Sequence, residues 1–402
     1  MTDLSTVATD YIDKNPLDKL MRVILIILIL LTASHAHNVP SDPILSLLPK
    51  LESLAQKAMH KKNVPGMAVA VVSKGKIIYI KGFGVRAIGR PEPVTSKTLF
   101  QLGSISKAIS STLIAILNRA QEISLEHPIE PIPGATLRHI LSHTTGMPSA
   151  GFNELIERGG SPLEAQKELQ KTILEEEPGK KFAYHNVVYN LLTHVIEAQS
   201  GASFESVLQE KLLKPLGMTN TSSTWEAFIL EENRVAIHVV RKIKGKNKKK
   251  GKFAKGVTQQ APYRKEYTNF PAAGGFSSNI HDMALFLGAV MGARPDIVSP
   301  QDLEEFTRPI IHTPDQWYRT TKHRDRITET QYGLGWRHMT FANHPVVFHG
   351  GMLRGFSTML AFLPDQQVGI VILQNANSSL ASQISMQFFD WVLGLPFKQW
   401  ID

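Results

Sequence analysis

Cysteine is absent from this chain of 402 residues, whereas histidine occurs 15 times. The absence excludes disulfide bonds, thiolate nucleophiles and cysteine-ligated metals, and it leaves the cellular compartment open. The histidines include no His-Glu-x-x-His arrangement of the kind that binds zinc on one face of a helix. The sequence therefore predicts no metal site and no cofactor. No internal repeat is visible in it.

The N-terminal region lacks an apolar run of the roughly 20 residues that a membrane-spanning helix needs. Its run from Val23 to Leu31 is shorter and follows the basic Arg22. Ser34-His35-Ala36 then supplies small residues where a signal peptidase would cut. We predict a leader of residues 1–36 with a cleaved export signal and a periplasmic or secreted protein, with an uncleaved membrane anchor as the alternative. Several acidic residues precede Met21, so we expect Met21 to be the true start.

Acidic residues are missing from residues 241–256, a lysine-rich segment that holds nine lysine and arginine residues. These nine charges equal the net charge of +9 of the whole chain, so the remainder is neutral overall. Like charges separated by glycine repel one another and resist packing, which predicts a solvated loop. Weak contact of this loop with an anionic envelope surface is the alternative. A nucleic-acid partner is not expected, because Phe253 is the one aromatic residue there.

A serine and a lysine are present at helical spacing in Ser104-Ile105-Ser106-Lys107, at the head of an apolar helical pattern. Residues three apart are neighbours on a helix, so the lysine amine can lie beside the Ser104 oxygen. Serine is a poor nucleophile unless such a partner takes its proton. Ser73-Lys74-Gly75-Lys76 has the same pattern, but it lies between two strand-like runs and indicates a hairpin turn.

Two further motifs follow in the sequence. Tyr184-His185-Asn186 opens a second apolar helix, and His349-Gly350-Gly351 lies between two β-rich runs. Tyr267-Thr268-Asn269 also fits Tyr-x-Asn, but it precedes a strand rather than a helix, which favours Tyr184. The order of the motifs resembles the penicillin-recognising serine hydrolases, which include class C β-lactamases, DD-peptidases, esterases and D-aminopeptidases. Five more segments are similar to that family: Leu99–Ser104, Leu141–Gly146, Leu213–Met218, Ala273–Gly275 and Tyr332–Trp336.

The resemblance implies a role for each motif. It makes Ser104 the nucleophile and Lys107 and Tyr184 its basic partners, and either of the two could be the base during acylation. A neighbouring ammonium would lower the pKa of the tyrosine phenol for that work. The substrate would be bound by Asn186, His349, Gly350 and Gly351, and the oxyanion by the backbone amides of Ser104 and Met352.

Histidine at position 349 departs from the lysine that β-lactamases and DD-peptidases carry there. Histidine titrates near pH 6.5, so at neutral pH it is a weaker partner for a substrate carboxylate. This residue looks like the esterase and D-aminopeptidase branches of the family. The other departure is His185, which we expect either to point away from the site or to narrow its entrance. We expect His143 to be structural. Arg354 and Ser357 follow the glycine pair and are candidates for substrate contact, with a solvated loop position as the alternative for the arginine.

The pattern of elements predicts an α/β domain over residues 42–402. Hairpin patterns near both ends flank a helical middle, which favours a mainly antiparallel sheet built from both termini and flanked by helices. The resemblance implies the same arrangement, with an inserted all-helical lobe at about residues 111–266 that includes the lysine-rich segment. The catalytic crevice would lie between the sheet and this lobe.

These observations predict an exported serine hydrolase that cleaves an ester, or a small amide or peptide, through a covalent acyl-enzyme. The expected partner is a small-molecule acyl substrate. One alternative is a β-lactamase or DD-carboxypeptidase. An alternative of another class is a penicillin-binding or sensor protein that is acylated and deacylates slowly. The substrate and its stereochemistry do not follow from the sequence, and neither does the oligomeric state.

Overall fold

The computed structural model describes residues 42–149, 152–241, 257–263, 265, 267, 269–313 and 325–401. The predicted leader and the lysine-rich segment beyond Arg241 lie outside the described residues. Almost all described residues belong to one compact unit, Ser46–Asp402. Among the described residues, no helix is both long and apolar enough to cross a membrane.

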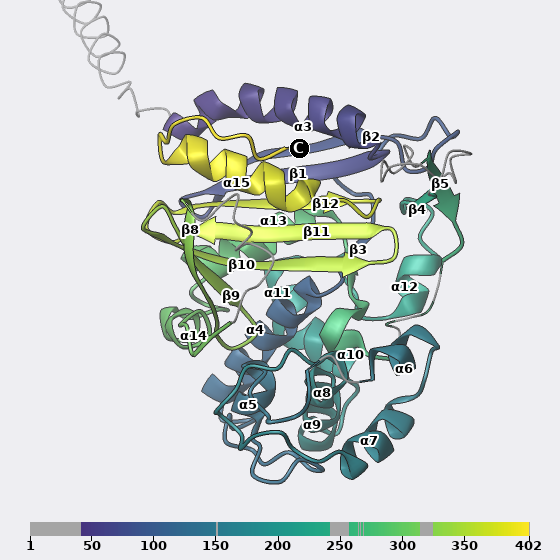
Figure 1. The fold of residues 1–402 in the computed structure, drawn as a ribbon, viewed down its shortest axis with the longest axis vertical. Helices are drawn as coiled ribbons and strands as arrows, with labels where there is room; N and C mark the ends of the chain where they lie inside the picture. The colour runs from purple at the N-terminus through teal and green to yellow at the C-terminus, as the bar shows by residue number, and fades with distance from the viewer. Residues whose placement is uncertain are drawn as a thin grey trace, which may run out of the picture. The chain divides into compact units, whose positions relative to one another are not determined.

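The main sheet has eight strands, and every neighbouring pair in it is antiparallel (Figure 1). Its order is β2-β1-β12-β11-β10-β9-β8-β7, so strands from the two ends of the chain pair directly, as β1 with β12. The strands are β1 (Gly66–Ser73), β2 (Lys76–Gly84), β7 (Ile311–His312), β8 (Ile327–Tyr332), β9 (Arg337–Phe341), β10 (His344–Leu353), β11 (Phe356–Leu363) and β12 (Val368–Gln374). The predicted antiparallel sheet built from both termini is confirmed.

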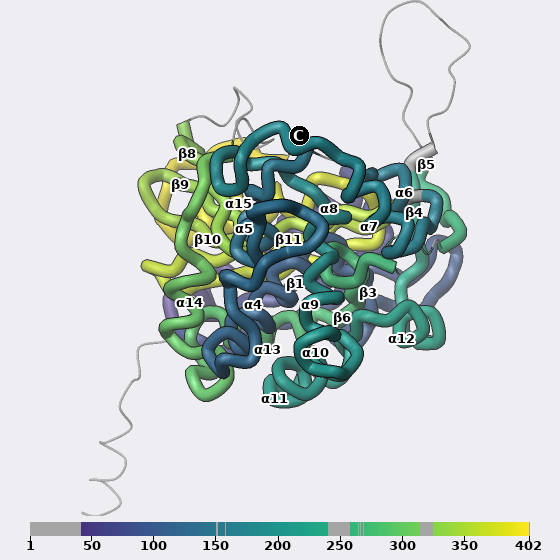
Figure 2. The backbone as a smooth tube through the Cα atoms, turned by 90° about the horizontal axis from the view of Figure 1, so that it is seen from below, coloured from purple at the N-terminus to yellow at the C-terminus, as the bar shows by residue number. Residues whose placement is uncertain are grey.

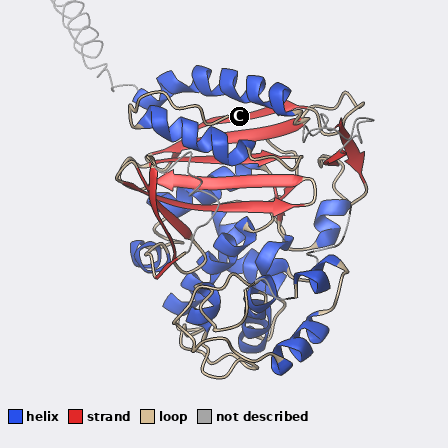
Figure 3. Cartoon of the chain, in the orientation of Figure 1, coloured by secondary structure: helices blue, strands red, loops and turns tan. Residues whose placement is uncertain are grey.

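The central strands form because their residues are apolar on both faces. All eight residues of β1 are buried, and so are all residues of β11 and β12. Branched side chains such as Val69 and Val71 suit this pleated, enclosed position. Helices α3 (Leu48–Lys62) and α15 (Leu380–Val392) cover one face, and α13 (Ile280–Gly288) and α4 (Ile105–Arg119) pack against the other (Figures 1 and 3).

The segment between β2 and β7 carries most of the remaining helices (Figure 2). They are α5 (Leu137–Leu141), α6 (Asn153–Glu157), α7 (Pro162–Lys171), α8 (Asn186–Tyr189), α9 (Leu191–Ser200), α10 (Phe204–Leu208), η2 (Gln209–Leu213), α11 (Lys214–Leu216), α12 (Trp225–Ile229), η3 (Pro271–Gly275), η4 (Ala289–Ala293) and α14 (Pro300–Phe306). A short 3-10 helix, η1 (Pro43–Leu47), precedes α3.

The middle of the chain is less uniform than an all-helical lobe. Strands β4 (Ile237–Arg241) and β5 (Val257–Ala261) pair on either side of the lysine-rich segment, and β3 (Phe100–Gln101) pairs with β6 (Ser277–Ser278). The β3–β6 pair matters for function, because it holds the chain immediately before Ser104 against the segment that follows η3. The apolar helix expected after Tyr184 is divided into α8 and α9 at Asn190.

Candidate active site

Helix α4 is central to the candidate site, because Ser104 precedes it and Lys107 lies in its first turn. The protein encloses this helix on nearly every side. Its residues Ile105 to Leu117 are all buried, including polar ones. A buried hydroxyl is costly unless it has a hydrogen-bond partner. Ser106 donates to the Gly103 carbonyl oxygen at 2.7 Å, and Ser110 donates to that of Ala272 at 3.3 Å. These bonds tie the start of α4 to its surroundings.

Ser104 is the residue before the first turn of α4, and its side chain makes no capping hydrogen bond to the helix. Its hydroxyl is therefore free of the capping hydrogen bond that a serine in this position usually makes to the helix backbone. The preceding Gly103 has φ of +56°, a conformation that favours glycine. The side chain of Ser104 is half-buried and lines a cavity of about 540 Å³.

Lys107 is completely buried, one turn after Ser104. Its Nζ donates to Asn186 Oδ1 at 2.7 Å and to the Ala273 carbonyl oxygen at 2.6 Å. Burial lowers the pKa of this amine, and the Tyr184 oxygen partly opposes the change. The two acceptors fix the amine 4.8 Å from the centre of the Tyr184 ring. The predicted pairing of this lysine with the tyrosine is present in the structure.

Tyr184 is half-buried, lines the same cavity, and has its oxygen close enough to Ser104 and Lys107 to interact with both. Burial by itself would raise the pKa of its phenol. The charges of Lys107 and Arg337 outweigh burial, so the pKa of Tyr184 is lowered. A phenol with a lowered pKa is better placed to act as a base toward a neighbouring hydroxyl. The structure therefore brings Ser104, Lys107 and Tyr184 together.

Asn186 lines the cavity and connects Lys107 to residues of two other segments. Its Oδ1 accepts from Lys107, and its amide nitrogen donates to the Tyr267 hydroxyl at 3.2 Å and to Asn153 Oδ1 at 3.3 Å. Tyr267 itself lines the cavity. Both sequences that fit Tyr-x-Asn thus contribute a tyrosine to this cavity, Tyr184 from the first and Tyr267 from the second.

The glycines of β10 let this strand approach the start of α4 closely. A β-carbon on Gly351 would lie 1.9 Å from the Leu102 carbonyl oxygen, and one on Gly103 would lie 2.9 Å from the Met352 nitrogen. Side chains would prevent such an approach. The Met352 amide thereby lies next to the Ser104 turn, where two backbone N–H groups can hold a developing oxyanion. Gly350, Gly351 and Met352 all line the cavity.

His349 is the predicted substrate-binding residue that the structure places elsewhere. Its side chain is fully buried and is not among the residues that line the cavity. Tyr332 donates to its Nε2 at 3.1 Å, and its Nδ1 donates to the Gly350 carbonyl oxygen at 2.9 Å. Burial holds the pKa of His349 well below its ordinary value. We therefore correct the expectation of substrate contact, because a neutral, enclosed ring with both nitrogens engaged supports the strand end instead.

Arg337 is a charged cavity residue that the sequence motifs did not predict. It is half-buried on β9, lines the cavity, and has its Cζ 5.0 Å from the centre of the Tyr184 ring and 5.4 Å from that of Tyr332. Its register neighbours are Tyr332 on β8 and Phe348 on β10, one residue before His349. The signal available in the sequence was weak: an arginine directly after the Tyr332–Trp336 motif.

The two histidines near Tyr184 are structural. His143 is buried with φ of +56°, and its ring centre is 4.3 Å from that of Tyr184. It accepts from the His185 amide at 3.3 Å. The His185 ring accepts from the Val188 amide at 3.3 Å and caps α8, so it points away from the site. Ser357 lines the cavity as expected, whereas Arg354 is not among the residues that do.

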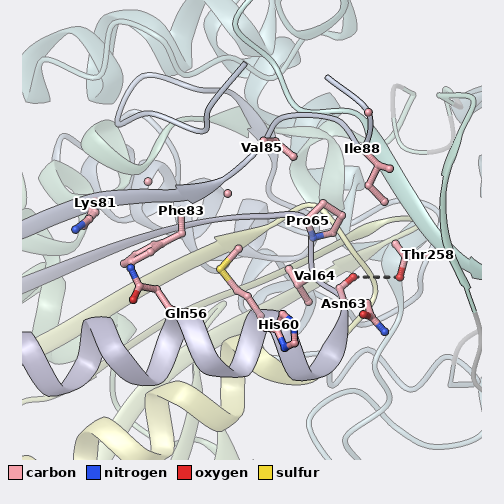
Figure 4. A pocket seen from close by; sticks show the side chains of 14 residues that line it. Gln56, His60, Asn63, Val64, Pro65, Lys81, Phe83, Val85, Ile88 and Thr258 are labelled. Carbon is pink, nitrogen blue, oxygen red and sulfur yellow. Dashed lines mark hydrogen bonds between the residues drawn. The ribbon is translucent and has the colours of Figure 1, made fainter. Parts of the chain in front are cut away.

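A second, larger hollow of about 980 Å³ lies along α3 and β2 (Figure 4). Figure 4 shows Phe83 and His60 on its walls and the hydrogen bond from the Thr258 hydroxyl to the Asn63 carbonyl oxygen, 3.1 Å long. Among the described residues that line this hollow there is no serine and no tyrosine. It offers no nucleophile with a base beside it, so the smaller cavity at Ser104 is the candidate active site.

Comparison with known proteins finds one family along most of the chain. The model of the family described as beta-lactamase matches residues 51–392. Similar curated proteins include the unguisins hydrolase ungD' of Aspergillus campestris, 25% identical over 82% of this chain and 61% of its own length. Protein flp of Staphylococcus aureus is 23% identical over 83% of this chain and 64% of its own length. The chain thus spans less than two thirds of these relatives.

Solved structures share the fold. The octameric penicillin-binding protein homologue from Pyrococcus abyssi superposes with a TM-score of 0.72 at 26% identity, over 87% of this chain and 78% of the other. A class C beta-lactamase superposes with a TM-score of 0.67 at 20% identity, over 88% of this chain and 99% of the other. With the family match across most of its length, this chain belongs to the beta-lactamase family.

Proposed function

We propose that this protein is a serine hydrolase that cleaves an ester, or a small amide or peptide, through an acyl-enzyme on Ser104. The single observation that carries the proposal is the meeting of Ser104 and Tyr184 at the wall of one cavity, with the Lys107 amine 4.8 Å from the centre of the Tyr184 ring. A nucleophile, a base and a group that holds the base are the three parts that such chemistry needs.

In the acylation step, the Tyr184 oxygen takes the Ser104 proton while the serine oxygen attacks the substrate carbonyl. Tyr184 suits the base better than Lys107 does, because the lysine amine already donates to Asn186 and to Ala273. The negative charge on the carbonyl oxygen is stabilised by the backbone amides of Ser104 and Met352. Tyr184 then returns its proton to the leaving alcohol or amine.

In the deacylation step, water attacks the ester on Ser104 and gives a proton to Tyr184. The phenol passes that proton back to the serine oxygen as the acid product leaves. Lys107 remains bound to Asn186 throughout and stabilises the ionised tyrosine. The enzyme returns to its starting state, so atoms and charge balance over the cycle.

The cavity favours a small acyl donor. Its volume of about 540 Å³ is in the range of small-molecule sites. The side chain of Met352 is 68% exposed at the cavity, beside the hydroxyls of Ser357, Ser378 and Ser382. A substrate with an apolar part near the scissile carbonyl and a polar remainder matches these walls.

The test is Ser104→Ala, assayed on p-nitrophenyl esters, D-amino-acid amides and nitrocefin. We expect turnover of any substrate that the native protein accepts to fall by at least about a thousandfold, because nucleophile and base act as a unit. Intact-mass spectrometry should detect an acyl adduct on the native protein and none on the variant. Undiminished hydrolysis by Ser104→Ala would reject the assignment.

A second candidate, β-lactamase or DD-carboxypeptidase activity, is favoured by one observation: Ser104, Tyr184 and Asn186 line one cavity, and Lys107 donates to Asn186 directly behind it. Rapid nitrocefin turnover would place it first. A fluorescent penicillin adduct that persists for hours would instead support a slowly deacylating binding protein.

We further propose that the protein is exported, with Arg22 and the apolar run after it as the supporting feature. N-terminal sequencing of the mature protein should find a start after residue 36. Retention of Met1 to Leu20 would contradict both the leader and the start at Met21.

A further inference from the structure

Two positive charges flank the ring of Tyr184, and one of them has no place in the mechanism described above. Lys107 approaches from α4, with its Nζ 4.8 Å from the ring centre. Arg337 approaches from β9, with its Cζ 5.0 Å from the same centre. The lysine is enclosed, whereas the arginine is half-buried and lines the cavity.

The other groups around this ring carry no charge near neutral pH. The His143 ring is in contact with it, and burial holds the pKa of His143 well below its ordinary value. The phenols of Tyr189 and Tyr332 interact with Tyr184, and burial raises the pKa of each well above its ordinary value. Behind Tyr332, His349 is neutral as well. Among the described residues, Lys107 and Arg337 are thus the charges that act on the Tyr184 oxygen.

We propose that Arg337 is a positioning residue for the proposed hydrolysis: its guanidinium, from the strand beside His349, holds the ring of Tyr184 and stabilises the negative charge that its oxygen carries as the base for Ser104. The inference rests on the proposed function. The geometry supports it, because the planar cation lies over the faces of both Tyr184 and Tyr332 and so fixes one ring against the other. A guanidinium stays charged at every pH at which the protein is folded, unlike a histidine at position 349.

The arrangement also explains how the site functions with a neutral strand end. Arg337 and Phe348 are register partners, so the arginine is placed next to His349 across the β9–β10 ladder. Strand β10 carries the glycines and therefore lets its backbone approach α4 closely, whereas β9 carries the positive charge of Arg337. These two strands pair directly.

The experiment measures the rate of Ser104 labelling by a fluorophosphonate as a function of pH, for native protein, Arg337→Gln and Arg337→Lys. An opposite charge at this distance shifts a pKa by about 1 to 3 units. We expect Arg337→Gln to move the acidic limb of the rate to higher pH by that amount, with labelling at pH 7 slower by about tenfold or more. Arg337→Lys keeps the positive charge, so the acidic limb of its labelling rate should lie close to that of the native protein.

Arg294→Gln is the matched control, because it also removes one guanidinium but from an exposed pair with Asp296. Its pH profile should equal that of the native protein. A merely structural role for Arg337 would lower the rate equally at all pH values in both variants, and that result would overturn the proposal. Labelling that persists in Ser104→Ala would instead reject the proposed function, so the two failures are distinct.

A second measurement applies even if the glutamine variant fails to fold. Tyrosinate absorbance of native protein minus Tyr184→Phe should reveal one phenol that ionises below the ordinary tyrosine pKa of about 10. Arg337→Lys should leave that titration nearly in place. A difference titration centred near 10 in the native protein would overturn the proposal.

Discussion

At the scale of single residues, the site depends on hydrogen bonds that hold one amine. Lys107 is fully buried in a helix of apolar neighbours, and an unpaired charge there would be very costly. Asn186 and the Ala273 carbonyl provide its acceptors. The pattern Ser-x-x-Lys fixes the spacing of nucleophile and amine, but the acceptors come from segments far along the chain.

Asn186→Ala should therefore slow acylation without moving Ser104. Loss of a hydrogen bond to a charged group costs about 1.5–3 kcal/mol, which corresponds to roughly a 10- to 150-fold drop in kcat/KM. Asn220→Ala removes an exposed amide and should leave kcat/KM unchanged. Steady-state assays on the preferred ester measure both. Equal kcat/KM for native protein and Asn186→Ala would show that the amide does not hold Lys107 in its working position.

At the scale of elements, catalysis requires β10 to lie almost against the start of α4. Hairpin β10–β11 pairs Gly351 with Thr358, whose hydroxyl donates to the Leu102 carbonyl oxygen at 2.7 Å. Gly351 leaves room for this contact and for the close approach of the Met352 amide. The positions of the two proposed oxyanion donors are thus set by packing between a strand and a helix.

Gly351→Ala should destabilise the protein where Gly350→Ala should not. The new β-carbon at position 351 would lie 1.9 Å from the Leu102 oxygen, whereas at position 350 its nearest neighbour would be 3.7 Å away. Forcing such a contact apart costs about 1–3 kcal/mol. Urea unfolding of the two variants checks the difference, and equal midpoints would mean that the strand shifts at no cost.

At the scale of the whole molecule, buried histidines couple stability to pH. Burial lowers the pKa of His139, His143, His185, His238, His338 and His349. For His338 and for His185 the pKa falls to about 4. The unfolded chain binds protons at these residues near pH 6.5, before the folded chain does. The free energy of unfolding should therefore be highest above pH 6.5 and fall as the pH drops toward 4.

The contribution of one of these histidines, His338, to the pH dependence of unfolding can be measured by substitution. His338 is buried on β9, and its Nε2 has no hydrogen-bond partner within the described part of the chain. His338→Leu should make the loss of unfolding free energy between pH 6.5 and 4 shallower by up to about 1.4 kcal/mol per pH unit, the value for one proton. His194→Gln, at an exposed position, should leave the slope unchanged. Denaturant unfolding at several pH values measures the slopes, and a parallel pair of curves for native protein and His338→Leu would contradict the assignment.

The sequence by itself determined the features that depend on local spacing. Ser104 and Lys107 lie one helical turn apart because residues three positions apart are neighbours on a helix, and short apolar runs near both ends of the chain indicated the strands that pair in the sheet. Only the tertiary structure decided which groups face the cavity. Arg337 lines the cavity although no motif predicted it, and His349 is buried away from the cavity although its motif predicted substrate contact. Both positions depend on strand register and burial, which involve residues far apart in sequence, so no local pattern encodes them.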